Sequence, residues 1–492
     1  MRISLAAAAV VLAAAFPVAA GAEERGVLTY HNDPARSGHF VVPGLTWEKA
    51  RWVHLDRGYE ARVAGHLYAQ PLYWRAPGSN AALVLTASED NVVQAFDATS
   101  GKELWRRAVG DAVTRSALPC GNISPLGITG TPVIDPSGEA VYLDAAVAEA
   151  NGPRHKIFAL ALKDGSILPG WPVDVADALR TTGEKFDPRV QNQRAALTIL
   201  HGMLYVAFGG HYGDCGDYHG WVVGVSLNDP RKITSWRTRA RGGGIWAPGG
   251  LAVVGRDLFF ATGNTFGASA WSDGEAVFRV GPDLTRSDDK RDFFAPSDWR
   301  ALDERDADLG GSNPVPIDVP GAGGRQALIL ALGKDRKAYL LDRSNLGGIG
   351  GQLAVDTVSS SLILTAPAVY PAGEGTYVAL QAPGARCPHA DESGLTVLQI
   401  KSGSPPAMTT AWCTAVRGRG AAIVTTTDGH SDPIVWILGA EGDDRLHAFK
   451  GDSGEPLFAS DALSGLRHFQ TLIATPDRLY VGADGRVYAF AF

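Results

Sequence analysis

The fold of this protein is decided by a stretch that reads Leu83-Val84-Leu85, a loop, and then Val92-Val93-Gln94-Ala95-Phe96-Asp97-Ala98-Thr99-Ser100-Gly101-Lys102-Glu103-Leu104-Trp105. The second apolar part alternates between the two faces of a strand. The Asp-x-x-x-Gly segment that follows supplies turn chemistry, because glycine accepts a positive φ. The closing Trp can pack one sheet against the next. The stretch therefore predicts paired strands, a tight turn and an aromatic contact between sheets.

The same pattern recurs along the chain, and two counts agree on eight units. Further copies of the second strand lie at residues 157–160, 222–225, 276–280, 338–342, 396–400, 446–449 and 487–490. The strand that opens each unit is often marked by a small-Pro-apolar step, as in Gln70-Pro71-Leu72 and Thr131-Pro132-Val133. The spacing suits four-stranded blades with loop insertions. The sequence predicts an all-β fold, with residues 23–492 forming one eight-bladed β-propeller of four-stranded antiparallel blades.

The last unit reaches Phe492 without an outer strand. Residues 47–56 have the character needed to supply it from the other end of the chain. We expect this N-terminal strand to close the ring, because an unpaired sheet edge invites aggregation. Two separate β domains are the alternative, although no Ser/Pro-rich linker divides the sequence.

Composition and the N-terminus indicate an exported globular protein. The 59 glycines and 29 prolines against 3 methionines favour many turns and few long helices. Residues 1–22 read as a signal peptide, with Arg2, an apolar run and a small-residue cleavage site at Ala20-Gly21-Ala22. We expect a periplasmic or secreted protein without membrane insertion after cleavage; an uncleaved anchor is the alternative. The net charge of −7, with scattered Lys and Arg, gives no electrostatic footprint for nucleic acid.

The chain has four cysteines, Cys120, Cys215, Cys387 and Cys413. In an oxidising compartment they can form two disulfides in three connectivities. We expect a Cys387–Cys413 disulfide, because both residues fall within one repeat. The sequence has no Cys-x-x-Cys-His motif, which excludes the usual attachment of a c-type haem.

The eight units resemble PQQ repeats, named from the bacterial quinoprotein dehydrogenases that use pyrroloquinoline quinone (PQQ) and also found in scaffold proteins. A narrower resemblance, carried by residues 30–38, 68–73 and 127–133, is to a largely uncharacterised bacterial group of exported PQQ-repeat proteins. In a propeller, side chains from many blades converge at one end of the central channel. We therefore expect a ligand site in this axial funnel.

Residues 242–343 resemble part of the quinoprotein alcohol dehydrogenase core. In that family a Trp is the floor on which PQQ stacks, and a Gly-Asn supplies a calcium ligand. An Asp is the catalytic base, and an Arg contacts the quinone oxygens. The resemblance implies these roles, in the same order, for Trp246, Asn264, Asp308 and Arg336, with PQQ and Ca²⁺ as cofactors.

The sequence also departs from that family. Its adjacent cysteine pair is absent, and its calcium-binding Glu has no clear match. The corresponding loop, residues 211–220, offers Asp214 or Asp217 instead, and Asp214 is the candidate metal ligand. Each residue also has a structural interpretation: Trp246 packs between blades, Asn264 is a turn residue, and Asp308 belongs to a solvated charge run. For Arg336 that interpretation is pairing with Asp335 or Asp342.

Three classes of function therefore stay open. The first is a PQQ- and Ca²⁺-dependent dehydrogenase of alcohols or sugars. The second is a non-catalytic propeller that serves as a scaffold or binding module, with a protein partner at the propeller face. The third is a polysaccharide-active enzyme centred on His211, Tyr212, His219 and Arg194, for which a carbohydrate is the ligand.

Overall fold

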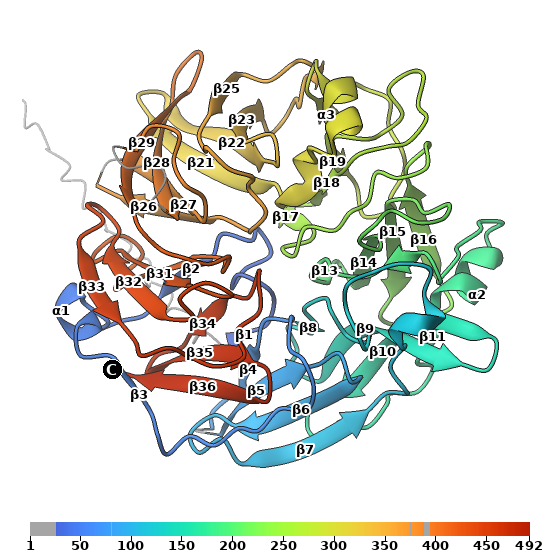
Figure 1. Cartoon of the computed structure of the whole chain (residues 1–492), viewed down its shortest axis with the longest axis horizontal. Helices are drawn as coiled ribbons and strands as arrows, with labels where there is room; N and C mark the ends of the chain where they lie inside the picture. The colour runs from blue at the N-terminus through green and yellow to red at the C-terminus, as the bar shows by residue number, and fades with distance from the viewer. Residues whose placement is uncertain (1–25, 80, 374, 388–393) are drawn as a thin grey trace, which may run out of the picture.

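The computed structural model describes residues 26–79, 81–373, 375–387 and 394–492, which form eight sheets arranged in a ring (Figure 1). This confirms the eight-bladed propeller. The predicted signal peptide lies outside the described residues. In the described part of the chain, no helix is long and apolar enough to cross a membrane.

The first four blades follow one another along the chain. Blade 1 contains β1 (Gly26–Val27), β4 (Leu72–Arg75), β5 (Ala82–Ala87), β6 (Val92–Asp97) and β7 (Glu103–Ala108). Blade 2 contains β8 (Val133–Ile134), β9 (Ala140–Glu149), β10 (Gly152–Ala161) and β11 (Val173–Asp174). Blade 3 contains β12 (Gln191–Asn192), β13 (Thr198–Leu200), β14 (Met203–Gly210), β15 (Trp221–Ser226) and β16 (Ile233–Arg237). Blade 4 contains β17 (Ala252–Val254), β18 (Asp257–Thr262), β19 (Ala276–Val280), β20 (Phe293–Ala295) and β24 (Gly348–Ile349).

The other four blades complete the ring. Blade 5 contains β21 (Val315–Gly321), β22 (Gly324–Leu332), β23 (Lys337–Asp342) and β25 (Ala354–Thr357). Blade 6 contains β26 (Ala368–Ala372), β27 (Gly375–Leu380), β28 (Leu395–Lys401) and β29 (Ala407–Thr414). Blade 7 contains β2 (His39–Val41), β30 (Ile423–Thr426), β31 (Ile434–Leu438), β32 (Leu446–Lys450) and β33 (Pro456–Ala459). Blade 8 contains β34 (Leu472–Ala474), β35 (Arg478–Ala483), β36 (Arg486–Ala491) and β3 (His54–Leu55). The short helices α1 (Trp47–Ala50), α2 (Val175–Arg180) and α3 (Trp299–Arg305) lie in the connections.

The tryptophan that ends a repeat joins neighbouring blades. The indole N–H of Trp105 in β7 donates to the Leu162 carbonyl of blade 2 at 2.9 Å. Its ring lies against Gly165, whose φ is +69° and where a Cβ would come within 2.6 Å of the ring. Trp412 and Gly454 repeat this arrangement between blades 6 and 7. The glycine of the turn is therefore needed both for its backbone conformation and for space.

The N-terminal part of the chain closes the ring, with one correction to the expectation. β3 pairs antiparallel with β36, so the outer strand of blade 8 does come from the N-terminal side. That strand covers only His54–Leu55, whereas Trp47–Ala50 is the helix α1 rather than a strand. The helix begins there because the Thr46 hydroxyl caps it by accepting a hydrogen bond from Lys49 N at 3.2 Å.

Residues 26–45, here called the axial segment, contact the inner side of blades around the ring (Figure 1). β1 pairs with β4 of blade 1, and β2 pairs in parallel with β30 of blade 7. Between them, the Pro34 carbonyl accepts from Val253 N at 2.8 Å, and the Ser37 carbonyl accepts from Val369 N at 2.7 Å. The axial segment thus ties blades 1, 4, 6 and 7 together, which the repeat pattern did not predict.

Arg36 anchors the axial segment and is fully buried. Its guanidinium donates to backbone carbonyls and hydroxyls on three sides: Tyr30 O at 3.1 Å, Leu197 O at 2.9 Å, Leu251 O at 3.0 Å, Thr29 Oγ1 and Thr198 Oγ1. Burial lowers the pKa of Arg36 to about 10, so the side chain stays cationic at neutral pH. The charge is compensated by this dense set of acceptors.

We expect the substitution Arg36→Gln to lower the free energy of unfolding by about 3–5 kcal/mol, because buried carbonyls on blades 3 and 4 lose a charged donor. Denaturant unfolding followed by circular dichroism measures this. The matched control is Arg57→Gln at an exposed site in the same part of the chain, which should change stability by less than about 0.5 kcal/mol. Equal stability of the two variants would contradict an anchoring role for Arg36.

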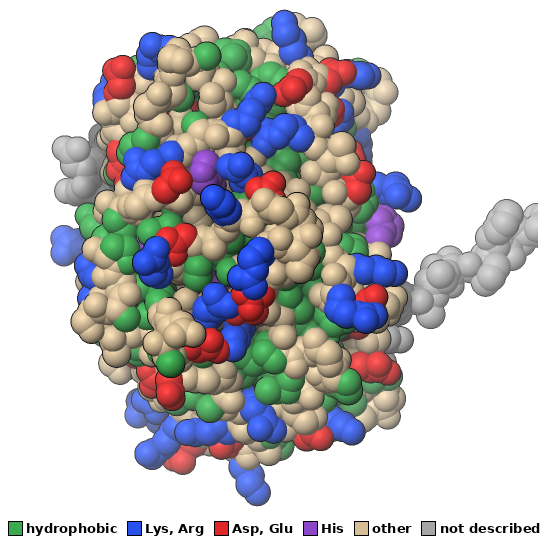
Figure 2. Space-filling view, turned by 90° about the vertical axis from the view of Figure 1, so that its right-hand side faces the viewer, with side chains coloured by type: hydrophobic (Ala, Val, Ile, Leu, Met, Phe, Trp, Pro, Cys, Tyr) green, Lys and Arg blue, Asp and Glu red, His purple; other side chains and the backbone are tan. Residues whose placement is uncertain are grey.

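Both disulfides are formed. Cys387–Cys413 lies within blade 6, as predicted, and Cys120–Cys215 joins the loop after blade 1 to a loop of blade 3. On the side of the molecule in Figure 2, positive and negative side chains are interspersed, as the mixed composition leads one to expect.

Candidate functional site

A cavity of about 620 Å³ lies at one end of the channel, within the size range of sites for small ligands. Its wall is built by loops of many blades, from Asn122 after blade 1 to Phe469 before β34. Four of the five predicted site residues, Asp214, Trp246, Asn264 and Asp308, line it. The propeller therefore brings together side chains that are far apart in the sequence.

Trp246, Asn264 and Asp308 meet around Gly263. Asn264 follows β18, and its backbone N–H donates to Asp308 Oδ1 at 2.7 Å. A Cβ at Gly263 would lie 2.4 Å from Asp308 Oδ1 and 3.3 Å from Trp246 Nε1. Glycine is therefore required at position 263, because the backbone there closely approaches the side chains of two candidate site residues.

Arg336 does not line the cavity. It is exposed, and its φ is +69° in the turn before β23. The cation at the site is instead Lys334, whose Nζ lies 2.6 Å from Asp308 Oδ2 and 2.8 Å from Asp306 Oδ1. The same ammonium lies 5.3 Å from the centre of the Trp246 ring. Lys334 thus sits between an aromatic face and a buried carboxylate.

Burial dominates the electrostatics of this group. It raises the pKa of Asp308, and the ion pair with Lys334 opposes that shift. Burial works against the charge on Lys334, but Asp308 and Asp306 outweigh it and raise the pKa of the lysine. Glu275 lies behind the site, where burial and then the nearby Asp308 raise its pKa well above the usual range. At neutral pH, Lys334 is therefore cationic, while the surroundings of Glu275 favour its protonated form.

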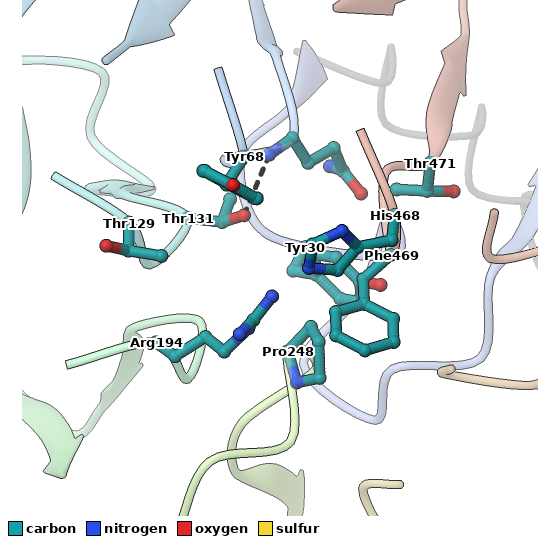
Figure 3. Close-up of a pocket in the computed structure, with 10 residues that line it drawn as sticks. Tyr30, Tyr68, Thr129, Thr131, Arg194, Pro248, His468, Phe469 and Thr471 are labelled. Atoms are coloured by element: carbon teal, nitrogen blue, oxygen red, sulfur yellow. Dashed lines mark hydrogen bonds between the residues drawn. The ribbon is translucent and has the colours of Figure 1, made fainter. Parts of the chain in front are cut away.

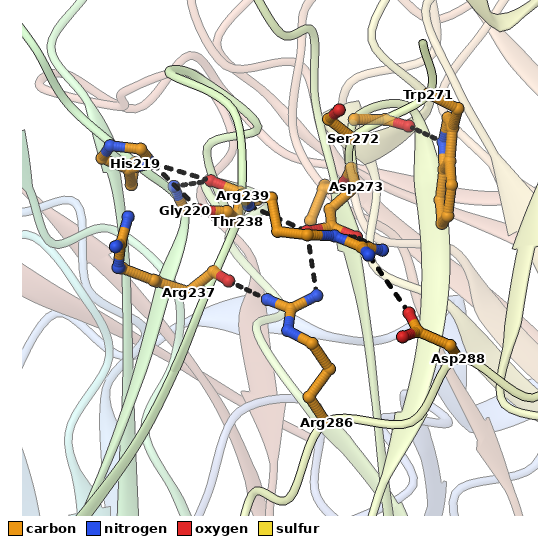
Figure 4. A network of polar contacts seen from close by, with 12 residues as sticks. His219, Gly220, Arg237, Thr238, Arg239, Trp271, Ser272, Asp273, Arg286 and Asp288 are labelled. Atoms are coloured by element: carbon orange, nitrogen blue, oxygen red, sulfur yellow. Dashed lines mark hydrogen bonds and ion pairs between the residues drawn. The ribbon is translucent and has the colours of Figure 1, made fainter.

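A network of ion pairs holds the loop that carries Asn264 (Figure 4). The buried Asp273 carboxylate accepts from Arg239 at 2.7 Å and from Arg286 at 2.9 Å. Arg239 also pairs with Asp288 at 3.2 Å. The carbonyl of Asp273 accepts from the Thr262 hydroxyl at 2.7 Å, which ties the loop back to the end of β18. This network therefore holds Asp273, near the end of the loop between β18 and β19, while Asn264 lies at the start of the same loop.

The loop of residues 211–220 is tethered by Cys120–Cys215 and contributes one wall. His211, Tyr212 and Asp214 line the cavity. His211 is buried, which lowers its pKa to about 4, and its Nε2 has no hydrogen-bond partner among the described residues. His219 does not line the cavity. Its ring Nδ1 lies 3.0 Å from the Thr238 carbonyl oxygen instead.

The residues present do not match a calcium site. Ca²⁺ takes six to eight oxygen ligands, usually with several carboxylates. No group of three or more His, Cys, Asp or Glu in the described ranges is arranged to hold a metal. The Asp308 carboxylate is already paired with Lys334, and Asp214 Oδ1 accepts from the Tyr218 hydroxyl at 2.7 Å. Asp217 points to solvent, with its side chain 85% exposed.

Sequence reasoning missed an axial ring of residues with one shared position. Each ring residue comes four positions before one strand of each blade, in order β4, β8, β13, β17, β21, β26, β30 and β34. The ring residues are Tyr68, Thr129, Arg194, Pro248, Gly311, Leu364, Arg419 and His468. All except Gly311 line the cavity or the small pocket beneath it. The sequence carries a signal for this ring. Once the strand that opens each repeat is placed, the ring residue lies four positions before it.

This protein is therefore a propeller with an axial cavity that is lined by cationic, acidic and aromatic side chains. Residues 60–278 match the family model described as "Outer membrane protein assembly factor BamB", a PQQ-repeat family. A comparison with curated proteins finds no match.

Several solved structures share the fold. The quinohemoprotein alcohol dehydrogenase ADHIIG from Pseudomonas putida HK5 is 13% identical, with a TM-score of 0.66, over 95% of this chain and 80% of that chain. The quinohemoprotein alcohol dehydrogenase from Comamonas testosteroni is 15% identical (TM-score 0.63, covering 96% and 81%). A europium-containing methanol dehydrogenase is 12% identical (TM-score 0.66, covering 96% and 98%). These structures show that the chain shares the propeller fold of the three dehydrogenases.

Proposed function

We propose that the axial cavity binds PQQ and that the protein is an exported dehydrogenase of alcohols or sugars. The observation that carries this proposal is the group of Trp246, Lys334 and Asp308 in one cavity of suitable size. A planar tricarboxylate needs an aromatic face and several cations. Trp246 offers the face, and Lys334, Arg194 and Arg419 offer the cations.

PQQ, when bound, would supply the hydride acceptor. The protein residues would bind and orient it and move the proton. Trp246 would support the ring, and the Lys334 ammonium would stabilise negative charge developing on an oxygen beside it. Asp308 would accept the proton of a substrate hydroxyl, since its raised pKa brings its basicity closer to neutral pH. We derive no step through a metal ion, because the residues do not match one.

Export is supported by the two disulfides, which persist in oxidising compartments such as the periplasm. A non-catalytic binding module is the second candidate, favoured by the poor match to a calcium site and by the absence of adjacent cysteines. The two candidate functions differ in whether the protein binds PQQ and oxidises a substrate with it.

We expect calorimetry to show that wild-type protein binds PQQ without added Ca²⁺. A second titration with added Ca²⁺ is run in parallel. Trp246→Ala should raise the dissociation constant about tenfold or more, because the stacking face is removed. Trp52→Ala is the matched control, since that side chain is 75% exposed. Absence of PQQ binding in both titrations would leave the binding-module function in its place.

A further inference from the structure

A buried glutamate lies behind the candidate site and takes no part in the chemistry proposed above. Glu275 is the last residue before β19, and it is fully buried. Its Oε2 accepts a hydrogen bond from Leu309 N at 2.6 Å, so it holds the peptide that joins Asp308 to Leu309. Its own N–H donates to the Gly263 carbonyl at 2.9 Å. Glu275 therefore connects the end of β18 in blade 4 to the segment that carries Asp308.

The backbone of Glu275 lies in the left-handed region, with a φ of +52°. Glycine adopts this conformation at little cost, whereas a residue with a Cβ is strained there. Asp273, two residues earlier, has a φ of +76°, and its carboxylate is held by Arg239 and Arg286. Such strain persists where the surroundings fix the residue, and it is often found at functional sites. A glutamate at a position that suits glycine therefore indicates that its side chain is used.

The Glu275 carboxyl group has no ion pair within the described ranges, and its Oε1 is buried without a hydrogen-bond partner there. Lys334 is already paired with Asp308 at 2.6 Å and with Asp306 at 2.8 Å. Burial, and then the nearby carboxyl groups of Asp308 and Asp303, raise the pKa of Glu275. A buried carboxylate without a cation is costly. These surroundings favour the protonated form of Glu275, which leaves the negative charge on Asp308.

The same hydrogen bond occurs at a second junction between blades. Glu89 lies between β5 and β6, is fully buried, and accepts from Gly127 N at 2.7 Å through its Oε2. Its Oε1 also lacks a partner among the described residues. Gly127 and Leu309 each come six positions before the strand that opens the next blade, β8 and β21. Glu89 and Glu275 are therefore equivalent contacts at two junctions.

The two junctions differ in what the held peptide carries. The residue before Leu309 is Asp308, whereas the residue before Gly127 is Leu126, which is buried in an apolar cluster. The segment after Gly127 leads to Thr129, which lines a pocket of about 10 Å³, close to the space of one water molecule (Figure 3). The peptide held by Glu89 thus carries no candidate catalytic side chain. Glu89 is a matched control for Glu275.

We propose that Glu275 is a positioning residue for Asp308, because its carboxyl group fixes the peptide that directly follows Asp308. That peptide sets the direction of the Asp308 carboxylate, whose two oxygens contact Asn264 N at 2.7 Å and Lys334 Nζ at 2.6 Å. As a neutral acid, Glu275 does this without placing a second negative charge beside Asp308. The role rests on the proposed function, in which Asp308 is the base, but the contact can also be tested without the cofactor.

The first test compares turnover of the PQQ-reconstituted full chain in three variants. Glu275→Gln keeps the size and the acceptor, whereas Glu275→Met and Glu89→Met each leave a buried N–H without an acceptor. Both methionine variants should therefore lower the melting temperature by a similar amount. Only Glu275→Met should lower kcat, by about 10–100-fold as a base is misplaced, with KM changed less than about threefold. Glu275→Gln should keep the wild-type kcat.

The second test follows the titration of Asp308 itself and needs no cofactor. Protein with ¹³C-labelled Asp carboxyl groups is studied by NMR, and the signal of Asp308 is the one that Asp308→Asn removes. Glu275→Gln and Glu89→Met should leave the midpoint of this titration in place. Glu275→Met should move it to higher pH, because the carboxylate loses its hydrogen bond from Asn264 N.

Equal effects of the two methionine variants on kcat and on the Asp308 titration would overturn the positioning role. A midpoint at lower pH in Glu275→Gln would overturn the neutral form, since it would show that Glu275 carries a charge. If Glu275→Met does not fold, Glu275→Asp replaces it, because its shorter side chain withdraws the acceptor from Leu309 N. If wild-type protein has no turnover with PQQ, the proposed function fails, while a shift of the Asp308 titration in Glu275→Met alone still supports the positioning role.

Discussion

Deletion of residues 23–58 is expected to abolish the single cooperative unfolding transition of the protein. This part of the chain buries five large apolar side chains, Val27, Phe40, Val42, Leu45 and Val53, in the core shared by blades 1, 7 and 8. At about 1.5–3 kcal/mol for each, their loss is about 8–15 kcal/mol. That is comparable to the whole stability of an ordinary domain.

The deletion also uncovers β36, whose edge then has no partner. We therefore expect a broad, non-cooperative melt in differential scanning calorimetry and concentration-dependent aggregation in light scattering. The control is a chain that starts at Gly26, which removes none of these contacts and should melt like the longer chain. A sharp transition at an unchanged temperature in the deletion variant would contradict both ring closure and anchoring by the axial segment.

The blades could be predicted from the sequence because each is a local unit. Its strands, its turn glycine and its Trp lie close together in the chain, so one good copy reveals the others. The Cys387–Cys413 disulfide could be predicted for the same reason. The axial segment could not, because it has no periodic pattern and its partners, such as Leu197 and Leu251, are far away in sequence.

At the candidate site, the order of the residues along the chain could also be predicted, whereas the local backbone conformation could not. The order of Trp246, Asn264 and Asp308 placed them in neighbouring blades, and the structure brings them together. Which basic residue of the Lys334-Asp335-Arg336 step faces the cavity depends on one turn. The left-handed backbone at Arg336 belongs to that turn, with Lys334 toward Asp308 and Arg336 exposed. Residue types alone do not reveal such a turn conformation.

Asp308→Asn is expected to lower dehydrogenase turnover of the PQQ-reconstituted protein by about 10²–10⁴-fold, the loss typical of a missing general base. The amide keeps the shape of the side chain and can still accept the hydrogen bond from Asn264 N. PQQ binding should therefore change little, and the effect should fall on turnover. Turnover is measured with an artificial electron acceptor on a panel of primary alcohols and aldoses.

Asp306→Asn is the matched control, because Asp306 pairs with the same lysine at 2.8 Å but its side chain is 63% exposed. This change should lower turnover less than about fivefold, since the exposed pair contributes little. The pH profile gives a second readout. Burial raises the pKa of Asp308, so wild-type turnover should rise with pH as this carboxyl loses its proton, and Asp308→Asn should lack that rise. Equal turnover of the two variants with an unchanged profile would show that Asp308 is not the base.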